Sequence, residues 1–157
     1  AFKSKINFGP VFYIAGILSI GAIMSNSGLD KFLASHVIDI LEPEKGQDAL
    51  NFVSILGLGI VSALGMTAPG APAITVPLAK TLAQATGFPL LTVLMIALTG
   101  QSLVLLPYAM PPVAVAIIVG GVKVGEAVRA TFVTAVAVTL FLAPLQYFYW
   151  KAIGMFG

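Results

Sequence analysis

The stretch Leu-Pro-Tyr-Ala-Met-Pro-Pro at residues 106–112 places three prolines in the middle of an uncharged segment. That segment, residues 88–121, is longer than the roughly 20 apolar residues that cross a bilayer, and too short for two full crossings with a turn. Proline removes a backbone N–H donor and pushes the preceding residue out of the α-helical region. We therefore predict one broken membrane span, whose second half-helix begins at Val113.

The composition indicates the class of protein. Of the 157 residues, 59% are hydrophobic and only 9% are charged, and the mean hydropathy is +1.03, whereas soluble domains carry about 25% charged residues. These values exclude a soluble enzyme domain and a disordered chain, and a net charge of +2 is too small for a nucleic-acid binder. With no cysteine, one histidine and no HExxH, GxSxG or Walker pattern, the chain carries no enzyme motif. We predict an all-α polytopic protein whose partner is the lipid bilayer.

Two other segments are typical membrane spans. Residues 8–25 are uncharged and end at Asn26-Ser27-Gly28, which is a helix-stop signature. Residues 130–150 are also uncharged, and they close with aromatic residues beside Lys151, a pattern typical of the membrane interface.

Residues 29–41 predict a helix that lies in the plane of the membrane interface. Most of the polar residues fall on a different side of this helix from the apolar ones. The apolar side chains close to one helical face are Leu29, Phe32, Leu33, Val37, Ile40 and Leu41.

Residues 50–87 predict a re-entrant hairpin. Its tip, Thr-Ala-Pro-Gly-Ala-Pro at residues 67–72, is hostile to a helix interior and separates two arms, the second of which begins at about Ala73. Non-helical backbone at membrane depth is tolerated only where protein or a water-filled cavity covers it. The alternative is two ordinary spans joined by an exposed proline-rich loop.

The order of span, hairpin, broken span and span sets the topology. Lys3 and Lys5 then share one membrane face with a charged connector at residues 123–129. We expect the mainly acidic segment from Asp30 to Asp48 on the opposite face, together with Lys31, Lys45, Lys80 and Lys151.

The two interruptions are the candidate binding site. In secondary transporters, half-helix N-termini face anionic groups and unwound carbonyls coordinate the coupling cation. We expect the tip and residues 108–112 to lie within contact distance near the bilayer midplane, with an anion held mainly by backbone amides. Gln101 either lines this site or makes an interhelical hydrogen bond. The candidate binding residues are Thr67, Ala68, Pro69, Gly70, Ala71, Gln101, Ser102, Ala109, Met110, Pro111, Pro112 and Val113.

The element order and four short motifs resemble the C-terminal third of the divalent-anion/sodium symporters, within the wider ion-transporter superfamily. The motifs are Ile6-Asn7-Phe8, Ser27-Gly28-Leu29, Ala-Ile-Thr-Val-Pro-Leu at residues 73–78, and residues 106–112. This resemblance implies an ion-coupled, alternating-access transporter of a small anion such as a dicarboxylate or sulfate, with Na⁺ or H⁺ as the coupling cation and no other cofactor. It also implies a homodimer in a bacterial-type inner or plasma membrane. The second inverted repeat would come from a missing N-terminal part or a separate subunit.

The family's sodium-coupled members carry a Ser-Asn-Thr triplet at the hairpin tip, and its spacing from Pro77 places it at Thr67-Ala68-Pro69. The family's threonine before Pro-Pro and asparagine after it correspond to Met110 and Val113. Most of the implied side-chain ligands are therefore absent, and we predict that sodium is not held at the usual hairpin position.

Two functions remain open from the sequence. One is a transport half-site, and the other is a non-transporting membrane subunit that keeps the fold without its ligands. A transport site requires Thr67, Gln101 and Ser102 to converge on one cavity, whereas a structural role is favoured if they face lipid or other helices. A channel is disfavoured because no candidate ring of charged residues lies within the spans.

Overall fold

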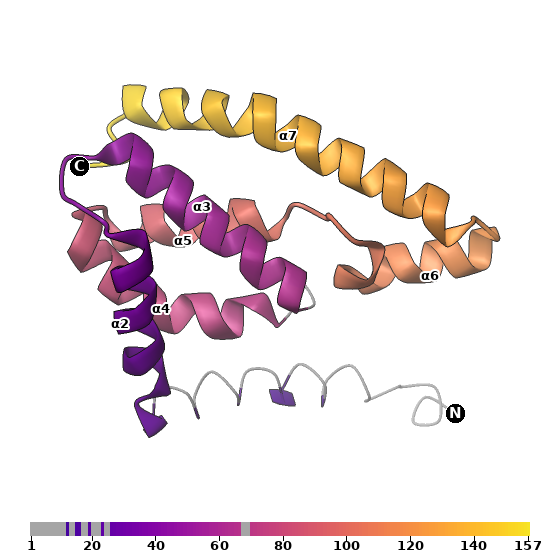
Figure 1. Ribbon diagram of the computed structural model, residues 1–157, viewed down its shortest axis with the longest axis horizontal. Helices are drawn as coiled ribbons and strands as arrows, with labels where there is room; N and C mark the ends of the chain where they lie inside the picture. The colour runs from indigo at the N-terminus through magenta and orange to yellow at the C-terminus, as the bar shows by residue number, and fades with distance from the viewer. Residues whose placement is uncertain (1–11, 13–14, 17–18, 20–22, 24–25, 67–69) are drawn as a thin grey trace, which may run out of the picture.

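The computed structural model describes residues 12, 15–16, 19, 23, 26–66 and 70–157. Within these residues there is no β-strand, and the predicted all-α class is confirmed (Figure 1). The elements in chain order are α2 (Leu29–Leu41), α3 (Asp48–Gly65), α4 (Ala71–Thr86), α5 (Leu90–Gln101), the 3₁₀-helix η1 (Pro107–Ala109), α6 (Pro111–Gly120) and α7 (Val124–Ala152).

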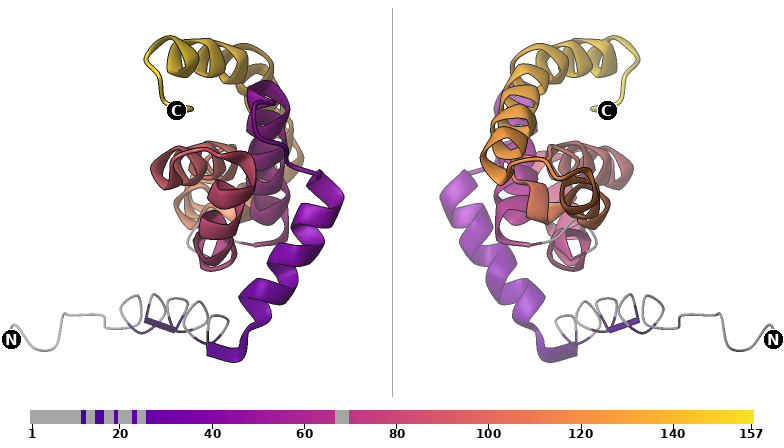
Figure 2. Two further views of the ribbon diagram at one scale, coloured as in Figure 1. Left: turned by 90° about the vertical axis from the view of Figure 1, so that its left-hand side faces the viewer. Right: turned by 90° about the vertical axis from the view of Figure 1, so that its right-hand side faces the viewer.

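Three helices form the centre of the molecule. α3 crosses α5, α4 packs against both, and α2 contacts α4. α7 is a long separate helix that runs from the end of α6 back towards the beginning of α3 (Figures 1 and 2). The core consists of apolar side chains from α3, α4 and α5, closed at one end by the C-terminal residues. Its members include Phe52, Ile55, Leu56, Leu78, Leu82, Val93, Ile96, Trp150 and Phe156.

The crossing of α3 and α5 brings two backbones into direct contact. A Cβ atom added at Gly59 would lie 2.5 Å from the carbonyl oxygen of Ala97, and one added at Gly100 would overlap the carbonyl oxygen of Leu56. Small residues permit such close approach between membrane helices. The crossing therefore requires glycine at both positions.

Both arms of the predicted hairpin are present as α3 and α4. Helix α3 starts two residues before the predicted position, at Asp48, and α4 also starts two residues early, at Ala71. Proline is favoured in the first turn of a helix, so Pro72 belongs to α4 and does not delay it. Pro77 also lies inside α4.

The open ends of the hairpin lie together. A Cβ atom at Gly87, just after α4, would lie 3.5 Å from the Lys45 side chain, which precedes α3. The Lys151 ammonium lies 3.9 Å from the Asp48 carboxylate, so these two residues lie at the same end of the molecule. Their placement on one membrane face stays a prediction. At 18 residues, α3 is about 27 Å long, close to the roughly 30 Å of a hydrocarbon core. Length therefore fits either a crossing or a hairpin, and the re-entrant depth stays a prediction.

The broken span is interrupted over more residues than predicted. α5 ends at Gln101, several residues before the prolines. Leu106 is extended before Pro107 (φ −127°, ψ 134°), and Met110 is extended before Pro111 (φ −123°, ψ 101°), as expected for residues that precede proline. α6 begins at Pro111 and not at Val113, again because proline suits the first turn.

The last helix is longer than predicted. α7 begins at Val124, so Glu126 and Arg129 belong to its first turns and not to a connector. It continues through Pro144 to Ala152. Among the described residues, α3 and α7 are the helices long and apolar enough to cross a membrane.

The structure confirms the bounds of the predicted helix at residues 29–41 but not its single apolar face. Helix α2 has the predicted bounds. Its apolar residues, however, divide between two environments: Leu33 and Val37 pack against the core, whereas Phe32 and Ile40 are exposed. The predicted span at residues 8–25 lies mostly outside the described residues.

We expect the α3–α5 crossing to be intolerant of a single methyl group. Gly59→Ala and Gly100→Ala should each destabilise the protein by about 1–3 kcal/mol, because the facing atoms belong to backbone and cannot rotate away. Gly57→Ala is the matched control, since a Cβ atom there meets nothing within 4 Å. Thermal unfolding of the purified full-length protein measures the difference. Equal melting temperatures for all three variants would contradict the close crossing.

The topology is testable by cysteine labelling, because the chain has no cysteine of its own. In a full-length protein freed of other cysteines, Asp48→Cys and Pro89→Cys should react from one side of the membrane and Lys123→Cys from the other. We choose Pro89 as the labelling position after α4, and not Gly87, because the φ of 82° at Gly87 favours glycine. Gly70→Cys should react slowly from both sides if the tip stops inside the membrane. Fast reaction of Gly70→Cys from the side of Lys123 would instead show two full crossings.

Candidate functional site

A buried hydrogen bond connects the two interrupted segments. Gln101, the last residue of α5, donates from Nε2 to the Thr75 hydroxyl at 2.7 Å. Thr75 lies in the second turn of α4 and donates in turn to the Ala71 carbonyl at 3.4 Å. Both side chains are buried, with 7% and 4% of their surface exposed. The residue that precedes the second interruption is therefore bonded to the helix that follows the first.

This bond resolves the two interpretations of Gln101. The interhelical hydrogen bond is the one that the structure shows. Thr75 was not among the predicted binding residues. Its only signal was a hydroxyl placed four residues after Ala71 on an otherwise apolar helical face, and many threonines in membrane helices share that pattern.

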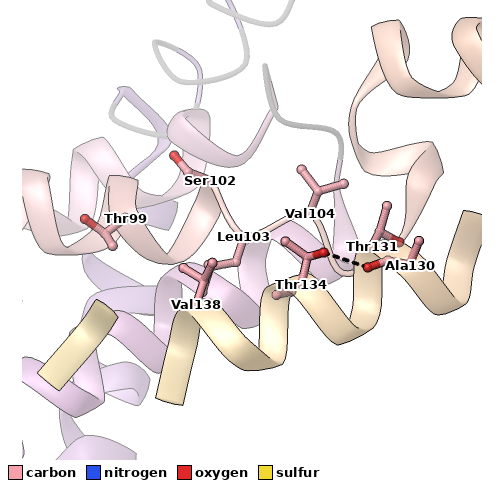
Figure 3. Close-up of a pocket in the computed structure, with 9 residues that line it drawn as sticks. Thr99, Ser102, Leu103, Val104, Ala130, Thr131, Thr134 and Val138 are labelled. Carbon is pink, nitrogen blue, oxygen red and sulfur yellow. Dashed lines mark hydrogen bonds between the residues drawn. The ribbon is translucent and has the colours of Figure 1, made fainter. Parts of the chain in front are cut away.

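Ser102 faces a different part of the molecule from Gln101. Its side chain is exposed and donates to the Leu98 carbonyl at 2.8 Å within its own helix. It lines a groove of about 410 Å³ between the end of α5 and α7, together with Thr99, Thr131 and Thr134 (Figure 3). Gln101 and Ser102 therefore do not converge on one cavity.

The hydroxyl groups of this groove have no proton to offer a ligand. Thr99 donates to Met95, and Thr134 donates to Ala130, as the dashed line in Figure 3 shows. Thr131 donates to the backbone carbonyls of Val128 at 3.1 Å and Leu105 at 3.3 Å. The second of these bonds ties the interruption to α7. Because only lone pairs remain, the groove accepts hydrogen bonds and is unsuited to an anion.

The hairpin tip is described only in part. Thr67, Ala68 and Pro69 lie outside the described residues, so their contact with the second interruption stays a prediction. Gly70 immediately precedes α4, and Ala71 is fully buried.

The beginning of α6 does not supply the expected amide cluster. Pro111 and Pro112 have no N–H group, and the Val113 amide donates to the Met110 carbonyl at 2.9 Å. The Ala114 amide donates to the same oxygen at 3.2 Å. The prediction that this half-helix presents free amides to an anion is therefore wrong, because two prolines and a local turn use up its donors.

The second interruption is rich in acceptors. Every residue keeps its carbonyl oxygen, whereas prolines remove donors and local turns consume others. The amides that donate to nearby carbonyls are those of Leu103, Leu105, Ala109, Met110 and Val113. Among the described residues no group of three His, Cys, Asp or Glu side chains could hold a metal ion. Neutral carbonyl oxygens are thus the groups that this interruption offers a cation.

We expect the Gln101–Thr75 pair to be energetically coupled. Gln101→Leu and Thr75→Val should each lower the free energy of unfolding by about 1–2 kcal/mol. The double variant should lose less than the sum, by about 0.6–1.7 kcal/mol, because both single changes remove the same bond. Ser102→Ala is the matched control, since its hydroxyl bonds within its own helix. Additive losses in this double-mutant cycle would show that the pair does not interact in the membrane.

Comparison with known proteins gives the family. The sequence model described as the sodium:sulfate symporter transmembrane region matches residues 1–156. An uncharacterized transporter of Haemophilus influenzae is 27% identical over 150 residues, which cover 94% of this chain but only 32% of that protein. No solved structure matches the chain. The chain spans about a third of the length of this relative, and by its match to the transmembrane region over nearly its whole length it belongs to the sodium:sulfate symporter family of membrane transport proteins.

Proposed function

We propose that this chain forms part of the transport pathway of a secondary transporter for a small divalent anion, sulfate or a dicarboxylate, that works by alternating access. The observation that carries the proposal is the non-helical interruption between α5 and α6, in a chain that matches the transmembrane region of the sodium:sulfate symporters. Interrupted helices are the parts from which secondary transporters build binding sites.

The two interruptions favour different ligands. The positive dipole end of α4 favours an anionic group at the hairpin tip, although Pro72 has no N–H group and the Ala73 amide donates to the Gly70 carbonyl at 3.0 Å. The carbonyl-rich interruption before α6 suits a coupling cation, Na⁺ or H₃O⁺ as the carrier of H⁺, which needs oxygen ligands. The pairing of an anion site with a neighbouring cation site supports coupled transport of the two.

Other parts of the assembly complete this proposal. Because the chain covers only 32% of its Haemophilus relative, we place the second inverted repeat in a preceding segment or a separate subunit. We propose a homodimer in a bacterial inner or plasma membrane, in keeping with the bacterial relative.

A second candidate is a non-transporting membrane subunit with the same fold. It is favoured because Gln101 and Ser102 face different parts of the molecule. Gln101 is buried against Thr75, whereas Ser102 faces the α7 groove. Met110 and Val113, where the family resemblance implies polar ligands, point the same way.

Uptake by the full-length protein in liposomes separates the two candidates. We expect uptake of radiolabelled sulfate or a four-carbon dicarboxylate under an inward sodium or proton gradient. Gln101→Leu should reduce this uptake about tenfold, because it releases α5 from α4, whereas Ser102→Ala should leave it within about twofold. Thr67→Ala should not change the dependence on sodium.

Two results of the uptake experiment would contradict these expectations. No uptake of any dianion under either gradient, by protein that is folded and correctly inserted, would favour the non-transporting subunit. Sodium-driven uptake that Thr67→Ala abolishes would show that the tip holds sodium after all.

A further inference from the structure

Two cavities meet at the end of the molecule where α3 begins and α7 ends. One is polar, has a volume of about 330 Å³, and is lined by Gln47, Asp48 and Lys151 among others. The other is apolar, has a volume of about 350 Å³, and runs between α3 and α7. Both are lined by Ala49 and Tyr147, so the two cavities lie side by side.

We propose that this pair of cavities is a binding site for one phospholipid with a zwitterionic phosphoethanolamine headgroup. The polar cavity takes the headgroup, and the apolar cavity takes an acyl chain. The proposal requires that this face of α3 and α7 is open to the bilayer in the full-length protein, and it is independent of what the protein transports.

The charges of the polar cavity complement such a headgroup. Lys151 and Asp48 contribute one positive and one negative group, and their 3.9 Å separation is at the limit of an ion pair. An exposed pair of this kind contributes only about 0–1 kcal/mol, so inserting a ligand between its members costs little. A phosphate can accept from Lys151 while a primary ammonium donates to Asp48.

The neighbouring groups hold the two charges in place. Lys151 donates to the Tyr147 hydroxyl at 3.4 Å and lies 5.7 Å from the centre of the same ring. Asn51 is almost fully buried and donates from Nδ2 to the Glu44 carbonyl at 2.7 Å, which fixes the loop that forms the rim. In the same loop Glu44 accepts a hydrogen bond from Gln47, which itself lines the polar cavity.

The apolar cavity has the dimensions of one leaflet. Along α7 it extends from Phe148 to Thr139, and the headgroup cavity continues to Lys151. From Lys151 to Thr139 the helix rises about 18 Å, slightly more than the roughly 15 Å of half a hydrocarbon core. Val53 and Phe148 border this cavity and are 61% and 66% exposed, so an acyl chain can reach it from the open side of α3 and α7.

Native mass spectrometry of the full-length protein tests the proposal. With equimolar phosphatidylethanolamine, phosphatidylcholine and phosphatidylglycerol, we expect a retained adduct that is mainly phosphatidylethanolamine. Lys151→Gln and Asp48→Asn should each lower the ratio of bound phosphatidylethanolamine to the other bound lipids (its excess) about three- to tenfold. Lys123→Gln, the same charge change at the opposite end of α7, is the matched control and should have no effect.

Two more variants separate headgroup binding from folding. Tyr147→Phe keeps the ring but removes the hydroxyl that accepts from Lys151, and should lower the same excess about twofold. Val53→Trp changes an exposed residue, leaves the charges intact, fills the apolar cavity and should remove the adduct.

Three outcomes would overturn the proposal. One is equal retention of the three lipids by the wild-type protein, and another is a preference for phosphatidylglycerol. The third is loss of a dimer in Val53→Trp with unchanged lipid adducts, which would show that a second copy of the chain covers the cavity.

Discussion

The contact between Gly59 and Gly100 is the constraint on which the rest of the structure depends. It brings the backbones of α3 and α5 together without intervening side chains, so α5 lies deep enough for its last residue to reach α4. Gly100 immediately precedes Gln101, whose amide is bonded to Thr75. If α5 moved outward by the width of one methyl group, that bond would lengthen or break. The close crossing and the link between the two interrupted segments are therefore consequences of the same two glycines.

In the interruption after α5, backbone hydrogen-bond acceptors outnumber donors. Backbone that leaves a helix inside a membrane has no water to bond, so its groups must find partners within the protein. Here the donors find them in local turns, and α7 contributes Thr131 as a donor to the Leu105 carbonyl. The result is a segment with more acceptors than donors. Such a segment complements a positively charged ligand better than a negative one, as the proposed cation site requires.

The sequence predicted effects that are local along the chain and missed those that act between helices. Pro107 and Pro111 set the conformation of Leu106 and Met110, and this effect of a proline on its predecessor was predictable. Pro77 and Pro144, by contrast, lie inside continuous helices, because a helix in lipid has few alternatives for its backbone. The partner of Gln101 is 26 positions away, and finding it requires the register between α4 and α5, which the apolar sequence of both helices does not specify. The Gly59–Gly100 contact was hidden for the same reason, since several other glycines in the chain meet open space.

The long uncharged stretch also has a consequence for acid–base behaviour. Residues 81–122 contain no Asp, Glu, His, Lys or Arg. The end of α4, all of α5, the interruption and α6 therefore keep the same charge throughout the physiological range. A ligand bound by these elements experiences an electrostatic environment that does not change with acidity. Any pH dependence of binding that originates here reports the protonation state of the ligand itself.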